Sequence, residues 1–318
     1  MSFSSKVKSE LCQHFGNATH CKIAELAAII NICGHIIEKD NKFCIKIQTE
    51  NFDVAKKCFT LLKKTFNIDI GILVRRNSQF KKSRAYFLYI KNSDDALKIL
   101  SATGTLFVED DKKIYVKSIN PMIVSCTCCK RAYIRGAFLS SGSVTNPEKT
   151  YHLEFVNTNL QYAEELKNLI SFFDIETKIV KRKEHYVLYV KEGELIVNLL
   201  NVMGAHVALM DFENVRILKD MRNNLNRIVN CETANLGKIV AASVKQVEDI
   251  NYIMKNSDFS ELPENLIEVA KLRVEYPDAS LKELGQMMKP PVGKSGVNHR
   301  LKKLGILADT LREEKGDI

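Results

Sequence analysis

RAYIRGAFLSSGSV at residues 131–144 and CKIAELAAIINICGHI at residues 21–36 both have the pattern of a helix that is apolar almost all round and stops at a glycine. The two closing glycines, Gly34 and Gly142, lie 108 residues apart (142 − 34). A helix with so little polar surface has to be buried on most sides, in a core or against a similar helix. Both helices also contain small residues that permit a close approach, namely Ala27, Ala28, Gly136 and Ala137. We therefore predict that the two helices pack together at the centre of the fold.

The same order of elements follows each of these helices: a strand, a helix, a pair of strands and a further helix. After the first helix they are predicted at residues 43–50, 52–66, 69–77, 84–91 and 94–102. After the second they are predicted at residues 151–156, 160–173, 177–183, 186–191 and 194–203. Paired basic residues recur at a similar offset, 106 residues (181 − 75), at Arg75/Arg76 and Lys181/Arg182. An order repeated at a constant offset marks an internal repeat, so we predict a duplicated α+β domain with a pseudo-two-fold axis.

The strands of the two halves are expected to form two sheets, each with one face covered by helices and one face open. Basic side chains of the strands would then line a saddle on the open faces, formed by Arg75, Arg76, Lys178, Lys181, Arg182 and Lys183. Such a surface suits the phosphates of a nucleic acid. The same residues would also be present if they were no more than solvated edge residues, and the pattern fits both interpretations equally.

A different pattern appears in residues 279–305, ASLKELGQMMKPPVGKSGVNHRLKKLG. Ser280 and Glu283 have the spacing of a capping box, which predicts the start of a short helix. Pro290 and the proline after it end this helix, because proline removes a backbone donor and disfavours helical geometry before it. A second helix is predicted to begin near Ser295. Two short helices joined by a tight turn with Gly and Pro are typical of a helix-turn-helix, whose second helix enters the DNA major groove.

The second helix of this motif has one apolar face and one polar face. Val297, Leu301 and Leu304 recur at helical spacing and are expected to face the core. The opposite face consists of side chains that can donate hydrogen bonds, which suits base edges and phosphates. Together with residues nearer the start of the motif, the candidate DNA-contacting residues are Ser280, Lys294, Ser295, Asn298, His299, Arg300, Lys302 and Lys303. The alternative is an ordinary solvated helix face, which is usually polar and charged as well.

Length and charge fit a protein of several domains with a polyanionic partner. A chain of 318 residues is long enough for two or three domains, each with its own core. A hydrophobic content of 45% is that of a globular protein, and a formal net charge of +9 favours a polyanion as partner. We predict the duplicated domain at residues 1–211, with halves at about 1–105 and 126–211. A linker helix and the helix-turn-helix domain, all-α, would follow at residues 212–318.

Nine cysteines, scattered from Cys12 to Cys231, indicate reduced thiols in a cytoplasm. The first residues contain no apolar stretch of signal-peptide length, and no run of the sequence approaches the length needed to span a membrane. Cys126, Cys128 and Cys129 form a cluster, but their spacing is not that of a two-by-two zinc site. No second Cys/His pair accompanies them at a suitable spacing. We therefore expect buried thiols, no bound metal and no cofactor.

Two nine-residue stretches of the apolar helices, residues 26–34 and 134–142, resemble the signature motif of LAGLIDADG homing endonucleases. Together with the downstream helix-turn-helix, in this order and at this length, the chain is similar to the bacterial WhiA regulators. The strings that carry this resemblance are SFSSKVKSEL at the start, CCKRAYIRGAFLSSGSV in the middle and LKELGQMMKPPVGKSGVNHRLKKL at the end. The resemblance covers essentially the whole chain.

The resemblance implies a fold and a function. The implied fold is α+β, a duplicated LAGLIDADG-like domain followed by an all-α helix-turn-helix domain. The implied function is sequence-specific DNA binding that regulates transcription, cell division and chromosome segregation, with sporulation added in some bacteria. Double-stranded DNA is the implied partner, with the transcription machinery or other regulators beside it. We accordingly expect a cytoplasmic, nucleoid-associated protein that is monomeric and makes no contact with a membrane.

One departure from the endonuclease pattern argues against nuclease activity. In the nucleases the acidic residue just before the motif glycine holds a divalent metal, whereas this chain has Cys33 and Ser141 at those positions. Two-metal hydrolysis needs carboxylates that bind hard cations. Glu25 lies at the other end of its helix and Glu154 lies on a strand, so neither is expected to take over, and we expect a protein that is not an enzyme.

Two alternative functions are kept beside the DNA-binding regulator. The first is a metal-dependent homing-type endonuclease, which carboxylates at the helix ends would favour. The second is a protein- or ligand-binding module whose helix-turn-helix makes only protein contacts, which a weak dependence of DNA affinity on salt would favour.

Overall fold

The computed structural model describes residues 2–39, 42–76, 84–109 and 112–315. These residues form two compact units, Met1–Lys219 and Asp220–Ile318. One helix, α8 (His206–Asn256), begins in the first unit and ends in the second. The sequence-based domain boundary near residue 211 therefore falls inside a helix. Among the described residues, no helix is both long enough and apolar enough to cross a membrane.

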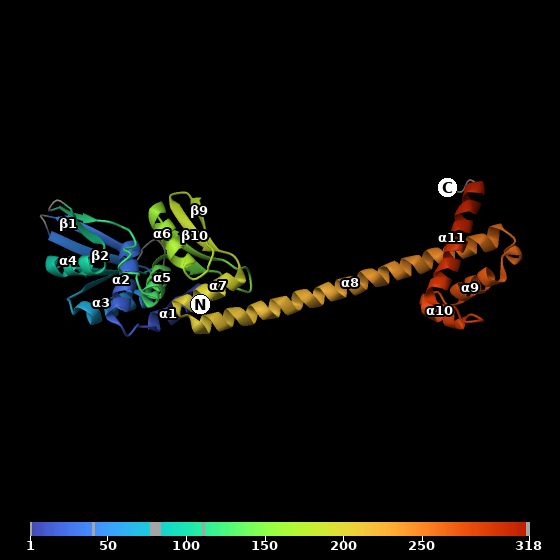
Figure 1. Ribbon diagram of the computed structural model, residues 1–318, viewed down its shortest axis with the longest axis horizontal. Helices are drawn as coiled ribbons and strands as arrows, with labels where there is room; N and C mark the ends of the chain where they lie inside the picture. Colours follow the sequence, from blue (N-terminus) through green and yellow to red (C-terminus); the bar gives the residue numbers. More distant parts are fainter. Residues whose placement is uncertain (1, 40–41, 77–83, 110–111, 316–318) are drawn as a thin grey trace. The chain divides into compact units, whose positions relative to one another are not determined.

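The first unit is organised around two helices, α2 (Thr19–Cys33) and α5 (Thr127–Ser141), which pack directly against each other. They lie between the two sheets of the unit (Figure 1). A Cβ atom on Gly136 of α5 would lie 2.5 Å from the backbone oxygen of Glu25 on α2, so the close approach requires glycine at this position. Ala27, Ala28 and Ala137 are buried in the same interface. The predicted pairing of the two apolar helices is confirmed.

The two halves repeat one sheet topology. The first sheet has the order β1-β2-β4-β3 and the second has the order β7-β8-β10-β9, all antiparallel. The strands of the first are β1 (Gly34–Lys39), β2 (Lys42–Thr49), β3 (Gly71–Arg76) and β4 (Arg84–Ile90). Those of the second are β7 (Gly142–Val144), β8 (Leu153–Asn157), β9 (Lys178–Arg182) and β10 (His185–Val190). Corresponding strands hold corresponding places, which confirms the predicted duplication.

The motif glycines join each central helix to its sheet. Gly34 ends α2 and begins β1, and Gly142 ends α5 and begins β7. A Cβ atom on Gly34 would overlap the carbonyl oxygen of Ile30, and one on Gly142 would overlap the ring of Phe138. Glycine is thus required where the chain turns from helix to strand. The sequence did not predict β1 or β7, because each strand begins at the glycine itself, with no loop between helix and strand.

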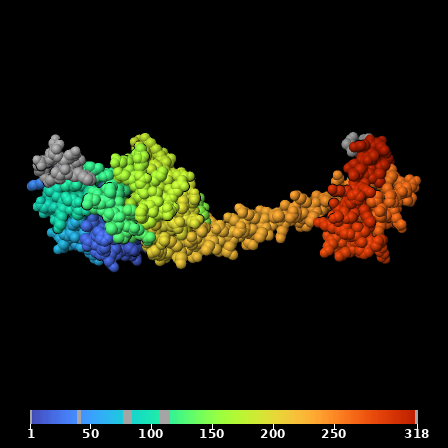
Figure 2. Space-filling view, in the orientation of Figure 1, coloured from blue at the N-terminus to red at the C-terminus, as the bar shows by residue number. Residues whose placement is uncertain are grey.

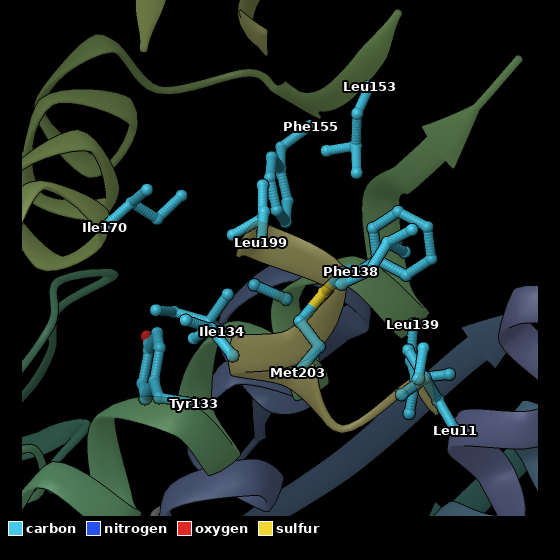
Figure 3. Packing of buried hydrophobic residues seen from close by; sticks show 14 of the residues in the cluster. Leu11, Tyr133, Ile134, Phe138, Leu139, Leu153, Phe155, Ile170, Leu199 and Met203 are labelled. Atoms are coloured by element: carbon cyan, nitrogen blue, oxygen red, sulfur yellow. The ribbon is translucent and has the colours of Figure 1, made fainter. Parts of the chain in front are cut away.

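Helices cover one face of each sheet. In the first half these are α3 (Phe52–Phe66) and α4 (Ser93–Ala102), and in the second they are α6 (Leu160–Ser171) and α7 (Gly193–Met203). Asn51, Asn92 and Asn159 cap α3, α4 and α6 through their side-chain oxygens, which satisfies otherwise unpaired backbone amides. Figure 3 shows part of the core of the second half, where Phe138 and Phe155 meet edge to face. Two further elements are α1 (Phe3–Gln13) and a hairpin of β5 (Leu106–Glu109) and β6 (Lys112–Tyr115). The sequence did not predict the hairpin.

The second unit is helical. It contains the end of α8, a 3-10 turn η1 (Phe259–Glu261), α9 (Glu264–Glu275), α10 (Leu281–Met287) and α11 (Lys294–Lys315). These helices share one core, in which Ile250 and Ile253 of α8 meet Leu284 of α10 and Val297 of α11. Figure 2 shows α11, in red, as a large part of the surface of this unit. Residues 220–242, in the middle of α8, are all exposed.

Candidate nucleic-acid interface

The first helix of the predicted helix-turn-helix begins at a complete capping box. The Glu283 backbone N–H donates to the Ser280 hydroxyl at 3.3 Å, and the Ser280 backbone N–H donates to the Glu283 carboxylate at 2.7 Å. The buried guanidinium of Arg273 donates to the backbone oxygens of Pro277 and Ala279, at 3.1 Å and 2.7 Å. These contacts hold the loop after α9 and the start of α10 in one geometry, as the sequence predicted for Ser280 and Glu283.

The turn between the two helices is tight because a glycine permits it. The Val292 backbone N–H donates to the Gly285 carbonyl oxygen at 2.8 Å, and a Cβ atom on Gly285 would overlap the Val292 carbonyl oxygen. The predicted inward face of the second helix is confirmed, since Val297, Leu301 and Leu304 are all buried in the core of the unit. The opposite face of α11 is therefore fixed in position by a packed core.

The structure brings the predicted DNA-contacting residues together on and around this motif. Six of the eight are exposed: Ser280, Lys294, Ser295, His299, Lys302 and Lys303. Asn298 and Arg300 are half-buried at the edge of this face, and the Arg300 guanidinium lies 3.6 Å from the sulfur of Met288. The Ser280 hydroxyl oxygen accepts the cap hydrogen bond, which leaves its proton for a further acceptor.

Two basic residues of the motif were missed by the helical-face argument. Lys282 on α10 and Lys289 in the turn are both exposed. The Lys289 backbone N–H donates to the Glu268 carboxylate at 2.8 Å, which anchors the turn to α9. The second helix also extends beyond the motif predicted at residues 279–305, because α11 continues through Gly305 to Lys315. The Arg312 guanidinium holds this extension against α8 through an ion pair of 2.7 Å to Asp249.

In the first sheet, the predicted basic residues divide between the two faces. Directly paired residues on antiparallel strands lie on the same face, and the face alternates along each strand. Arg75 lies on the face opposite the helices, with its guanidinium 5.6 Å from the ring centre of Phe87. Arg76, paired with Arg84, has the register of the helix-covered face. The placement of both residues on one open face was wrong. Lys46 joins Arg75 there, 4.8 Å from the same ring, and was not predicted.

The second sheet shows the same alternation. Lys178 and Arg182 lie on the face opposite the helices, in register with Tyr189 and His185, whereas Lys181 pairs with Tyr186 on the helix-covered side. Lys183 lies in the turn after β9, with a φ of 54°. The predicted placement of Lys181 on the open face was therefore wrong as well.

The chain's excess positive charge lies in the first unit. Acidic and basic residues balance in residues 220–318, so the formal net charge of +9 belongs to residues 1–219. Within the second unit, the basic residues gather in the helix-turn-helix, which holds Lys282, Lys289, Lys294, Arg300, Lys302 and Lys303. The second unit thus has no net charge but a local excess of basic residues in the helix-turn-helix, where Glu283 is the one acidic residue between Ser280 and Lys303.

At the positions of the nuclease metal ligands, the structure has a half-buried thiol and a hydroxyl bonded to backbone. The Cys33 thiol lies 3.8 Å from the Ser140 carbonyl oxygen, and the Ser141 hydroxyl donates to the Ala137 carbonyl oxygen at 3.4 Å. Burial raises the pKa of the Cys33 thiol above its usual value, although the charges of Lys8 and Lys117 oppose the shift. A neutral thiol beside two lysines offers no charge that would hold a divalent cation.

The two carboxylates considered as replacements are both occupied. Glu25 is buried and lies 2.5 Å from the Lys57 ammonium, and its two oxygens accept from Arg135 at 3.2 Å each. Glu154 accepts from Arg182 at 3.3 Å and lies 3.0 Å from His152. Each carboxylate is therefore already paired with basic side chains.

The cysteine cluster of Cys126, Cys128 and Cys129 differs from the expectation of buried thiols. Cys129 is buried, but Cys126 and Cys128 are exposed. His20 and Cys21, at the start of α2, lie beside Cys128 and Cys129 at the start of α5. A second Cys/His pair is therefore present. Sequence spacing missed it because the pair comes from the other half of the repeat.

Comparison with known proteins agrees with this organisation. Three family models match successive parts of the chain: a WhiA N-terminal LAGLIDADG-like domain at residues 19–106, a WhiA LAGLIDADG-like domain at residues 130–222 and a WhiA C-terminal HTH domain at residues 225–308. A protein of Lachnoclostridium phytofermentans named "Probable cell division protein WhiA" is 53% identical over 315 residues, 98% of this chain and 100% of that protein. A protein of the same name from Clostridium botulinum is 48% identical and covers 98% of this chain and 99% of its own length.

Solved structures show the same fold. Full-length WhiA from Thermatoga maritima superposes with a TM-score of 0.60 at 23% identity, covering 98% of this chain and 99% of that one. The N-terminal LAGLIDADG domain of a WhiA protein has a TM-score of 0.51 at 23% identity and covers 64% of this chain and 90% of its own.

Proposed function

The chain belongs to the WhiA family, and we propose that it is a sequence-specific DNA-binding regulator with a role in cell division and without nuclease activity. The observation that carries this proposal is the polar face of α11. A buried row of Val297, Leu301 and Leu304 fixes the helix, and the opposite face presents hydroxyl, imidazole and ammonium donors to solvent. Such donors pair with base edges and phosphates in the major groove.

The residues of this face differ in what they would contact. His299 and Ser295 are short side chains on the exposed side of α11, which suits contact with base edges. Lys294, Lys302 and Lys303 carry long, exposed cationic chains, which suit phosphates and so contribute affinity without sequence preference. Lys282 and Lys289, from the adjoining helix and turn, extend the same basic surface.

The duplicated domain would add DNA contacts without adding chemistry. Its net positive charge and the open-face residues Lys46, Arg75 and Lys178 support weak, sequence-tolerant contact with phosphates. Cys33 and Ser141 support the absence of cleavage, because neutral sulfur and hydroxyl ligands leave the charge of hard cations uncompensated.

The regulated process is proposed from the family. The Lachnoclostridium and Clostridium relatives are named as probable cell division proteins, and a DNA-binding relative of them would act through gene expression or through the nucleoid. We therefore place transcription control and chromosome segregation in the proposed role of this chain. Sporulation belongs to the same proposal where the host forms spores, and the transcription machinery or another regulator is the proposed protein partner.

The experiment that tests DNA binding is a salt titration of the full chain on duplex DNA, read by fluorescence anisotropy. Each phosphate contact contributes a slope of about 0.9 in the plot of log affinity against log salt. Lys302→Ala should lower that slope by about one, whereas Lys271→Ala, an exposed lysine on α9, should leave it unchanged. An affinity that barely depends on salt would favour the protein- or ligand-binding module instead.

A further inference from the structure

Four metal-ligating side chains from the two halves of the duplicated domain meet at one end of the central helix pair. They are His20 and Cys21 at the start of α2, and Cys128 and Cys129 at the start of α5. His20 and Cys128 are 108 residues apart, as are Cys21 and Cys129, which is the offset of the motif glycines Gly34 and Gly142. The four residues therefore occupy two pairs of equivalent positions about the pseudo-two-fold axis.

Their ligand atoms are already as close as a single small ion requires. All four lie within 4.8 Å of one another, and the Nδ1 atom of His20 is 3.0 Å from the Cys129 sulfur and 3.5 Å from the Cys21 sulfur. Zinc takes thiolate sulfur at about 2.3 Å and imidazole nitrogen at about 2.0 Å in a tetrahedron, which puts ligand atoms about 3.5–3.8 Å apart.

The ligand types select the metal. Three thiols and one imidazole are soft ligands that suit zinc, whereas calcium and magnesium take oxygen ligands. An iron–sulfur cluster would need space for its own iron and sulfide ions between the thiolates, and the observed separations leave room for a single ion. The set is also complete, because four protein ligands close a tetrahedral site and leave no position for substrate or water.

The helix ends at the cluster favour negatively charged sulfur ligands. Neither α2 nor α5, both described over their full length, has a side-chain cap or an acidic residue in its first turn. The positive ends of both helix dipoles therefore face the cluster and favour thiolate sulfur.

We propose that His20, Cys21, Cys128 and Cys129 bind one zinc ion, which fastens the two halves of the duplicated domain together at the start of the central helices. The ion is structural. It lies at the opposite end of α2 and α5 from Cys33 and Ser141, so it does not replace the metals of a nuclease. Because each half supplies two ligands, binding would stabilise the pairing of the halves, and the free energy of binding would add to the stability of the fold.

Metal analysis of the full chain tests the proposal. The protein is purified without a histidine tag or chelator, and zinc and iron are measured by inductively coupled plasma mass spectrometry. We expect roughly one zinc ion per chain and no stoichiometric iron. The double variant Cys128→Ser/Cys129→Ser should abolish zinc binding, because it removes two direct ligands. Removing only a group that hydrogen-bonds to a ligand already lowers metal affinity by roughly 10- to 100-fold. The matched control is Cys126→Ser, which removes an exposed thiol at the same helix end that is not one of the four proposed ligands; this variant should keep its zinc.

A second measurement keeps the proposal testable if the double variant fails to fold. In the wild-type chain, titration of the thiols with an organomercurial should release zinc in step with modification, and cobalt substitution should give the charge-transfer band of thiolate–cobalt bonds. A chelator should lower the melting temperature of the wild type and of Cys126→Ser alike. Purified wild type without stoichiometric zinc, with iron in its place, or with a disulfide between these cysteines by mass spectrometry would overturn the assignment.

Discussion

Gly136 of α5 lies against the main chain of α2 at Glu25, so closely that a Cβ atom on Gly136 would be 2.5 Å from the Glu25 carbonyl oxygen and 3.0 Å from the Ala28 Cβ. Glu25 contributes to the same contact through its side chain, which binds Arg135, the neighbour of Gly136. The interface between the two halves thus combines backbone packing with a buried ionic contact at a single level of the helix pair.

Gly136→Ala should lower the free energy of unfolding of the first unit by about 1–3 kcal/mol, because the added methyl group has to push two helix backbones apart. The intrinsic helix propensity works the other way, since alanine is favoured over glycine by about 1 kcal/mol in a helix. Gly237→Ala isolates that term, because the same methyl group on α8 meets no atom within 4 Å. Calorimetric melting should show the first variant destabilised and the second unchanged or stabilised. Equal melting curves for the two would contradict the close packing.

Glu25→Gln should cost about 3–5 kcal/mol, because it leaves the buried charges of Lys57 and Arg135 without their carboxylate. Lys57 is the more sensitive partner, since burial already lowers its pKa and Glu25 is the group that opposes this shift. The control is Glu213→Gln, which breaks a more exposed pair with Arg216 one turn away on α8 and should cost about 0–1 kcal/mol. Denaturant unfolding compares the two, and a similar loss in both would argue against a buried network.

The variants Arg75→Ala and Arg76→Ala test which face of the first sheet contacts DNA. Arg75 lies on the open face and Arg76 has the register of the helix-covered face. On duplex DNA of random sequence, Arg75→Ala should reduce the slope of log affinity against log salt by about one, and Arg76→Ala should leave it closer to the wild-type value. If both arginines changed the slope equally, or neither did, the open face would not be a DNA-contacting surface.

The purified chain should leave supercoiled plasmid intact for hours in magnesium or manganese, because Cys33 and Ser141 cannot hold the two hard cations that phosphodiester hydrolysis uses. A restriction endonuclease in the same buffer serves as the positive control for the plasmid and the ions. Double-strand cleavage at a specific site that EDTA abolishes would make the protein an enzyme and reverse the assignment of the duplicated domain.

The arrangement of the first unit could be predicted because the sequence patterns that produce it are local and occur twice. Apolar helices ending at Gly34 and Gly142, followed by the same element order, predict the central pair and the two sheets. Strand β7 was missed because it has three residues and follows the helix directly at Gly142, without a loop. The full 51-residue extent of α8 was not predicted: a linker helix was expected from residue 212, whereas α8 begins at His206, inside the predicted duplicated domain.

The exposed face of α11 could be predicted because the spacing of apolar residues along a single helix determines which face is buried. Burial of Val297, Leu301 and Leu304 orients the opposite face of α11, and spacing alone predicts that. The basic saddle was partly wrong because adjacent residues of a strand alternate between faces, which separates Arg75 from Arg76. The cluster of His20 with Cys129 was missed because motif spacing compares residues within one segment, whereas these residues come together across the repeat.

The central claim is that α11 directs this protein to particular DNA sequences, and mapping of bound DNA across the host genome tests it most directly. The native chain and a variant with His299→Ala and Lys302→Ala are compared by crosslinking, immunoprecipitation and sequencing, with equal protein levels verified by blotting. The account predicts discrete enriched sites that share a sequence motif for the native chain, and loss of those sites for the variant. An unchanged set of sites in the variant, or no enriched sites for the native chain, would contradict it.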